Sequence, residues 1–149
     1  MSQAIPQMRN LAERLIAYET MENGSVTLEG SGAFPVSEKL RPNLAALVGN
    51  GGVGAHLSRA LVLAASELLW LQSMRVKSDG SLEWVYELRT PTTPDEFLEG
   101  RVVLLAQLLG LLVAFIGEAL TLRLLHEVWP KVPLVDSAFT NGVSNEKTN

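Results

Sequence analysis

The longest run of apolar positions in the chain lies between Arg101 and Glu118. Of the sixteen residues from 102 to 117, only Gln107 has a polar side chain. The run is too apolar for the surface of a globular protein, yet it is shorter than the ~20 residues that a membrane-spanning helix needs. A helix that is apolar on every side is normally buried among other helices. The pattern therefore predicts a hydrophobic central helix over about residues 94–116.

The residues around this run indicate where its helices begin and end. Thr93 is followed by Pro94, and Glu96 lies three residues after Thr93. This is a typical helix start, because the hydroxyl caps the first turn and proline suits the first helical position. Gly117 indicates a break, after which an amphipathic helix is predicted over 118–128.

Two other stretches have helical periodicity. Apolar residues recur every three or four positions over 8–22 and over 53–74. In the second stretch we expect a buried helix-packing seam formed by Leu57, Leu61, Ala64, Leu68 and Leu71. The solvent-exposed side is expected at Arg59, Ser66 and Ser73. A shorter helix is predicted over 42–48, after a turn at 37–41, because Pro42 suits the start of a helix better than its interior.

The segment 74–88 is compatible with two structures. Asp79-Gly80 is a turn signal, so the residues on either side could pair as a β-hairpin, or Ser81 could begin a short helix. The pattern slightly favours the helix. We therefore predict an all-α fold, a single-domain bundle of five or six helices over 1–140, with a flexible polar tail at 141–149.

Composition and charge narrow the classes of function. A chain of 149 residues can bury a core of its own, and the absence of cysteine excludes disulfides, thiolate metal sites and thiol catalysis. The net charge of −4, with basic residues widely spread, argues against nucleic-acid binding. The first residues have no basic segment followed by an apolar one, so we expect a cytoplasmic protein.

One motif suggests a cofactor. Gly49, Gly51 and Gly54 form a G-x-G-x-x-G pattern directly before a predicted helix, as in dinucleotide-binding folds. That interpretation requires 44–48 to be a strand within a parallel sheet, and the chain offers few other strands. A glycine-closed turn between two helices is the favoured interpretation, so these glycines are only weak candidates for cofactor binding.

Other chemistry has little support in the sequence. His56 and His126 lie on different predicted helices and lack ligands at metal-binding spacing, and no serine has a matched histidine and acid. We therefore predict no metal, no cofactor and no catalytic residues. A buried Gln107 needs a hydrogen-bond partner, for which Tyr18 or Tyr86 is expected.

The surplus of apolar residues on 53–74 favours a role in binding. Val62, Leu63, Leu69 and Trp70 widen its apolar surface beyond one seam, and Trp84 lies in a turn-rich segment. The candidate interaction residues are therefore Trp70, Trp84, Leu69 and Leu63.

We expect a non-enzymatic module that binds a protein partner or itself. The first alternative is a bundle with an apolar pocket for a lipid-like small molecule, and the second is a nucleotide-binding enzyme using the loop 49–54. Insertion of the hydrophobic stretch into a membrane is a further variant, without direct support in the sequence.

Overall fold

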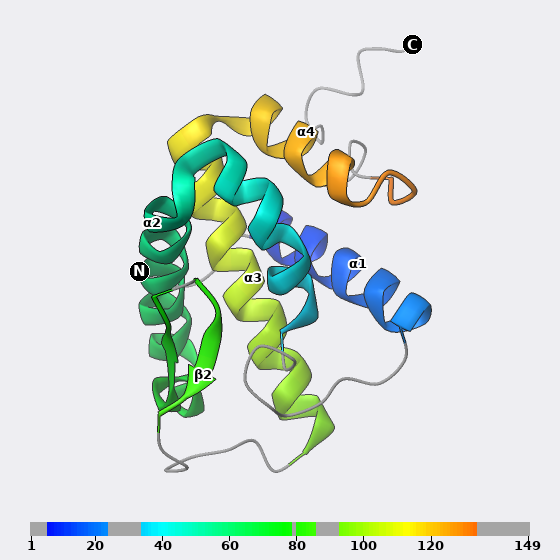
Figure 1. The fold of residues 1–149 in the computed structure, drawn as a ribbon. Helices are drawn as coiled ribbons and strands as arrows, with labels where there is room; N and C mark the ends of the chain where they lie inside the picture. The colour runs from blue at the N-terminus through cyan, green and yellow to red at the C-terminus, as the bar shows by residue number, and fades with distance from the viewer. Residues whose placement is uncertain (1–5, 24–33, 79, 86–92, 134–149) are drawn as a thin grey trace.

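The computed structural model describes residues 6–23, 34–78, 80–85 and 93–133. These form α1 (Pro6–Asn23), α2 (Pro35–Glu67), a 3-10 helix η2 (Leu69–Ser73), β1 (Met74–Val76), β2 (Leu82–Trp84), α3 (Pro94–Ile116) and α4 (Glu118–Val128) (Figure 1). The predicted all-α class is confirmed. The predicted count of five or six helices is wrong, because the described residues contain four α-helices. The predicted tail at 141–149 lies outside the described residues.

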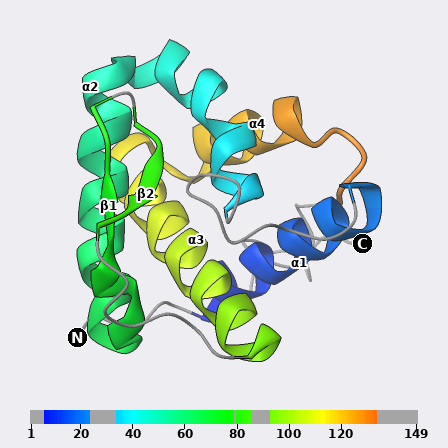
Figure 2. The same cartoon turned by 60° about the horizontal axis from the view of Figure 1, so that its bottom comes forward.

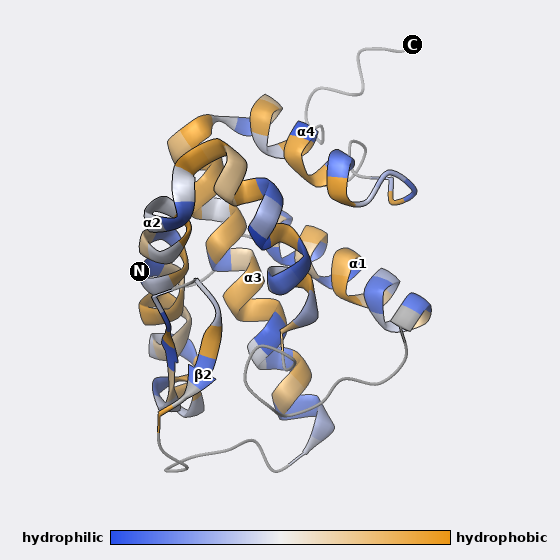
Figure 3. Ribbon diagram, viewed as in Figure 1, coloured by the Kyte–Doolittle hydropathy of each residue, from blue (hydrophilic) through white to orange (hydrophobic). Residues whose placement is uncertain are grey.

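Helix α3 is the centre of the molecule, as its apolar sequence predicts. Helices α1 and α2 pack against it, and apolar residues extend along most of its length (Figures 1 and 3). Its start is capped as expected, since the Glu96 amide donates to the Thr93 hydroxyl at 3.1 Å. By length and composition alone α3 could cross a membrane, but 56% of its most apolar stretch is buried inside the molecule. The core helix of a soluble protein can have the same length and apolar composition.

Helix α2 bends sharply at Gly49, where φ is 80° and ψ is 163°. This backbone conformation is nearly confined to glycine. The bend separates a first arm, residues 35–48, from a second arm, residues 50–67 (Figures 1 and 2). The two predicted helices on either side of Gly49 are thus arms of one bent element, which is one reason why the helix count is lower.

The first arm begins earlier than predicted. It starts at Pro35, and Pro42 lies inside it, so the predicted turn at 37–41 is wrong. An internal proline removes one hydrogen bond and costs about 3 kcal/mol. Here Val36, Leu40 and Leu44, four residues apart, bury one continuous face of the arm. Burial of three such side chains offsets the loss, at roughly 1.5–3 kcal/mol each.

The favoured helix within 74–88 is also wrong over the part that is described, where a β-hairpin forms. Met74 pairs with Trp84 and Val76 with Leu82. Gly80, with φ 89°, lies in the turn, and the Val85 amide donates to the Ser73 carbonyl at 2.7 Å. The predicted helix over 53–74 correspondingly stops at Glu67. Ser73, expected on the solvent-exposed side of that predicted helix, is buried.

A buried polar cluster joins three distant parts of the chain. The Glu19 carboxylate on α1 accepts hydrogen bonds from Lys39 Nζ on α2 at 2.8 Å and from Trp129 Nε1, just after α4, at 2.7 Å. The Lys39 ammonium also lies 5.9 Å from the centre of the Trp129 ring. These contacts attach the C-terminal end of α4 to α1 and α2.

Candidate functional site

The second arm of α2 has one side that no other described element covers. Residues Gly51, Ala55, Ser58, Val62 and Ser66 recur at helical spacing and are all exposed; we call them the α2 outer surface. The opposite side carries the predicted seam, of which Leu57, Leu61 and Ala64 are buried. The arm lies at the edge of the molecule (Figures 1 and 2). The outer surface therefore faces solvent.

The five residues of this surface are uncharged, and Val62 is the one large side chain among them. Val62 is 69% exposed, and the other four residues are glycine, alanine and serine. A Cβ added at Gly51 would meet no atom within 4 Å, so that end of the surface is open. Arg59 is also exposed and, seven residues before Ser66, lies along the edge of the same side of the helix. The small residues allow another helix to approach this surface closely.

Phe115, near the end of α3, contacts the second arm of α2 at His56. Its ring is 62% exposed and packs edge-on against the imidazole, with 4.8 Å between ring centres. The His56 Nδ1–H donates to the Gly52 carbonyl at 2.9 Å, which fixes the imidazole. The exposed aromatic ring is thus held against the second arm of α2.

The structure separates the four predicted interaction residues. Leu69 is 52% exposed and Leu63 is half-buried, whereas Trp70 is 8% exposed and packs against Phe97 with 6.1 Å between ring centres. The Trp70 indole belongs to the core in this structure, and its role as an interaction residue stays a prediction. The backbone of Trp84 lies in β2, and its side chain lies outside the described residues.

The glycine motif is part of a bent helix. Gly49 makes the bend, while Gly51 and Gly54 are helical, and 44–48 is helical rather than the strand that a dinucleotide fold requires. The strands of the described residues form a single antiparallel pair. The geometry at these glycines thus fits the favoured turn between helices.

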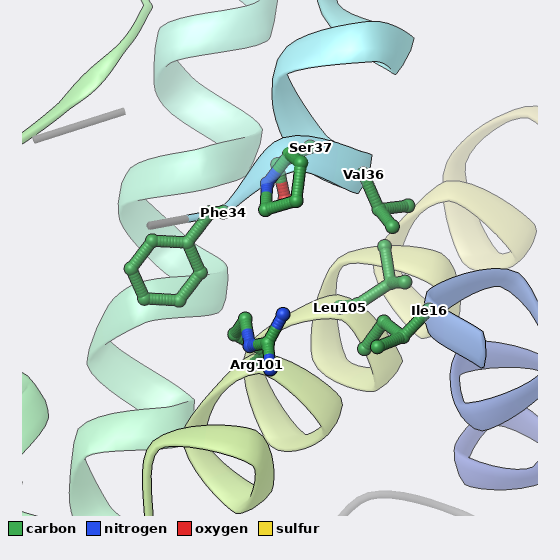
Figure 4. Close-up of a pocket in the computed structure, with 7 residues that line it drawn as sticks. Ile16, Phe34, Val36, Ser37, Arg101 and Leu105 are labelled. Atoms are coloured by element: carbon green, nitrogen blue, oxygen red, sulfur yellow. The ribbon is translucent and has the colours of Figure 1, made fainter. Parts of the chain in front are cut away.

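A cavity with a cationic wall lies where α1, α2 and α3 meet (Figure 4). It has room for about one water molecule and is lined by Ile16, Phe34, Pro35, Val36, Ser37, Arg101 and Leu105. We call it the Arg101 pocket. The Arg101 side chain extends into the space between Phe34, Ser37 and Leu105 (Figure 4).

The Arg101 guanidinium has no polar partner among the described residues. Its Nε is buried without a hydrogen bond, and no carboxylate of the described chain forms an ion pair with it. Its one specific contact is with the Phe97 ring, whose centre lies 5.0 Å away. Burial lowers the pKa of Arg101 below its usual value. Sequence reasoning missed this pocket, although an arginine in an apolar helix without an acid three or four residues away is a detectable signal.

Other candidate chemistry is sparse. A second cavity, lined partly by Leu40, Leu44 and Leu108, also has room for only about one water molecule, far below the ~300 Å³ at which ligand pockets normally begin. The described residues contain no group of three His, Asp or Glu side chains that could hold a metal. Gln107 donates to the Glu67 carboxylate at 2.9 Å, a partner that was not predicted. Of its two expected partners, Tyr86 lies outside the described residues.

No protein-family model, curated protein or solved structure matches this chain. Its function is therefore inferred from the α2 outer surface itself.

Proposed function

We propose that this protein is a non-enzymatic assembly module that binds a second copy of itself through the α2 outer surface. The observation that carries the proposal is the 69% exposure of Val62 among small, uncharged residues of one helix face, with Arg59 at its edge. When a partner covers apolar side chains that are exposed on an ordered helix, the free energy of the system falls, so association is favoured.

The order of large and small residues supports a second copy as the partner. The surface begins with Gly51 and Ala55 and continues to Val62 and Ser66. If two copies pair antiparallel about a twofold axis near Ser58, Val62 of one copy lies opposite Ala55 of the other. The large residue of each copy then fills the space left by the small residue of its partner, and both helices can approach closely.

The alternative of a lipid carrier has weaker support. Both cavities are apolar on most sides, but each has room for only about one water molecule and is too small for an acyl chain. The nucleotide-binding alternative lacks its strand at 44–48. Neither therefore competes with self-assembly on the observations above.

Sedimentation velocity of wild type and Val62→Glu tests the proposal. Wild type should sediment as a dimer, and Val62→Glu as a monomer with unchanged far-UV circular dichroism, because the new carboxylate would be buried against the partner copy. Met21→Glu is the matched control: Met21 is 83% exposed on α1, so this variant should remain dimeric. A monomeric wild type, or a dimeric Val62→Glu, would overturn the proposal.

A second substitution distinguishes close helix packing from nonspecific hydrophobic association. Ala55→Phe adds apolar area at an exposed position, so adhesion driven by area alone should become stronger. In the proposed pair, Ala55 lies opposite Val62 and has no room for a ring. Dimerisation should therefore weaken, and stronger dimerisation would contradict the proposed register.

A further inference from the structure

The glycine motif at the bend of α2 contains a dipeptide with chemistry of its own, Asn50-Gly51. Gly49 makes the bend, and Asn50 and Gly51 follow it in the first turn of the second arm (Figure 1). Both residues are exposed. Self-assembly through the α2 outer surface uses Gly51 as a small residue and gives no role to Asn50.

The side chain of an asparagine can react with the backbone that follows it. The backbone nitrogen of the next residue attacks the side-chain Cγ, and the new C–N bond closes a succinimide ring. The bond from Cγ to the side-chain nitrogen breaks, and this nitrogen leaves as ammonia with the proton of the attacking amide. Water then opens the ring at either carbonyl, so the product is aspartate or isoaspartate. The net reaction consumes water, releases ammonia and needs no other reagent.

The structure around Asn50 favours this reaction in two ways. The attacking residue is glycine, and even a Cβ added at Gly51 would meet no atom within 4 Å, so no neighbour blocks the ring closure. Gly51 also lies in the first turn after a non-helical residue, where backbone N–H groups lack an acceptor within the helix. Its nitrogen is therefore not held back by an intrahelical hydrogen bond.

Ring closure also requires Asn50 to leave the helical conformation. Glycines at 49, 51 and 52 surround it, and glycine lowers the free-energy cost of leaving a helix. Helix ends open locally with free energies near zero, far below that of global unfolding. The bend thus places the asparagine where the helix protects it least.

We propose that Asn50 is a site of spontaneous covalent modification, which converts it through a succinimide to aspartate and isoaspartate. Either product adds a negative charge next to Gly51, the first residue of the α2 outer surface. Isoaspartate also carries the main chain through its side-chain carbon and so lengthens the backbone in the first turn. The conversion takes place within one copy, so this inference holds or fails independently of self-assembly.

Peptide mapping by mass spectrometry tests the proposal on the folded protein, incubated at mildly alkaline pH. A synthetic peptide with the sequence of residues 47–57 gives the rate without a fold. Conversion of Asn50 in the protein should be within about tenfold of the peptide rate, because the first turn opens at little cost. Val62→Glu is measured alongside, so that protection by a second copy is recognised. A slower rate in both proteins would overturn the proposal.

The products identify the route. Fragmentation that distinguishes the two isomers should find both aspartate and isoaspartate at position 50, because the ring opens at either carbonyl. Aspartate alone would indicate direct hydrolysis of the side chain by water and would overturn the succinimide.

A matched pair of substitutions tests Gly51 as the attacking residue. Gly51→Ala should slow the conversion severalfold, because the methyl group hinders the backbone nitrogen, while the open space around it leaves the fold intact. Gly54→Ala lies outside the dipeptide in equally open space and should slow the conversion much less. Equal slowing by both would mean that helix stability alone sets the rate, and it would overturn the assignment of Gly51.

Discussion

Gly100 shows how closely the core is packed at the scale of one residue. A Cβ at this position would lie 2.1 Å from Cζ2 of the buried Trp70 indole, whereas at Gly110, on the same helix, the nearest atom would be 3.9 Å away. The two glycines therefore occupy opposite environments within α3. One makes room for an aromatic ring, and the other has ordinary space beside it.

Alanine substitutions at these two positions should have opposite effects. Gly100→Ala should destabilise the protein by about 1–3 kcal/mol through overpacking, and Gly110→Ala should be neutral or stabilise it by up to about 1 kcal/mol through helix propensity. Urea unfolding followed by far-UV circular dichroism measures both. In the double variant, Trp70→Phe should recover part of the stability lost in Gly100→Ala, because the smaller ring makes room for the new methyl group. If the free-energy changes of the two substitutions are strictly additive, the contact between the Gly100 Cβ and the Trp70 ring is not the cause of the loss.

The ion pair between α1 and α3 makes stability depend on pH. Hydrogen bonds from Arg9, at 2.9 and 2.6 Å, lower the pKa of Glu99 below its usual value of 4.5. A carboxyl with a depressed pKa in the folded state contributes stability above its unfolded pKa, and this contribution is lost as the pH falls through the folded value. Both side chains are more than a third exposed, so solvent screening limits the contribution to about 1 kcal/mol or less.

Glu99→Gln should therefore be less stable than wild type at neutral pH. The difference should stay constant at pH values well above 4.5 and shrink as the pH falls through the lowered pKa of Glu99, because the wild-type carboxylate becomes protonated there. Unfolding free energies of the two proteins across this range measure the effect. A difference that persists in acid would show that the substitution disturbs packing rather than an ion pair.

At the scale of elements, the bend at Gly49 determines the path of α2. The Gly49 backbone has φ 80°, a conformation that residues other than glycine rarely adopt. Gly54, by contrast, is helical, and a Cβ added there would meet no atom within 4 Å. Gly49→Ala should destabilise the protein by about 1–3 kcal/mol. Gly54→Ala should stabilise it by about 0.5–1 kcal/mol. Thermal unfolding of the two variants checks the contrast, and equal effects would mean that the bend does not require glycine.

The ends of α3 and α4 could be predicted because local residues define them. Thr93 caps α3 with its own hydroxyl, and Gly117 separates the two helices. The start of the first arm at Pro35 and the choice of hairpin over helix at 74–88 could not be predicted, since both depend on distant packing. Val36, Leu40 and Leu44 bury a face that outweighs the cost of the internal proline, and no nearby residue signals this.

The exposed apolar residues of 53–74 could be predicted in part from the sequence, whereas the Arg101 pocket could not. Surplus apolar residues on 53–74 indicated that some apolar side chains there are exposed, and Leu69 is one of them. Which residues face solvent depends on how α3 and the hairpin pack against α2, and this places Trp70 inside and Val62 outside. The Arg101 pocket needs three helices to converge, so the spacing of residues on any one of them does not reveal it.

At the scale of the whole molecule, one arrangement accounts for both sites. Helix α3 is surrounded by α1 and α2, so the most apolar part of the sequence is used for the core. The second arm of α2 supports this core with one side and leaves the other side in water. The convergence of α1, α2 and α3 creates the Arg101 pocket at a separate place.

Net charge leads to a prediction for assembly of the whole molecule. Each copy carries a net charge of −4, and the α2 outer surface has no ionisable residue to form pairs across the interface. The antiparallel register also brings the Arg59 side chains of both copies to the same border of the interface. Association through this surface should thus be opposed by electrostatic repulsion and driven by apolar burial.

Raising the salt concentration from about 0.05 to 0.5 M should consequently tighten the dimer, because the Debye length falls below the separation of most charges. Sedimentation equilibrium of the wild-type protein at several salt concentrations measures the dissociation constants. A dimer that weakens as salt rises would have to be held by ion pairs, which the α2 outer surface cannot supply, and the interface would then lie elsewhere on the molecule.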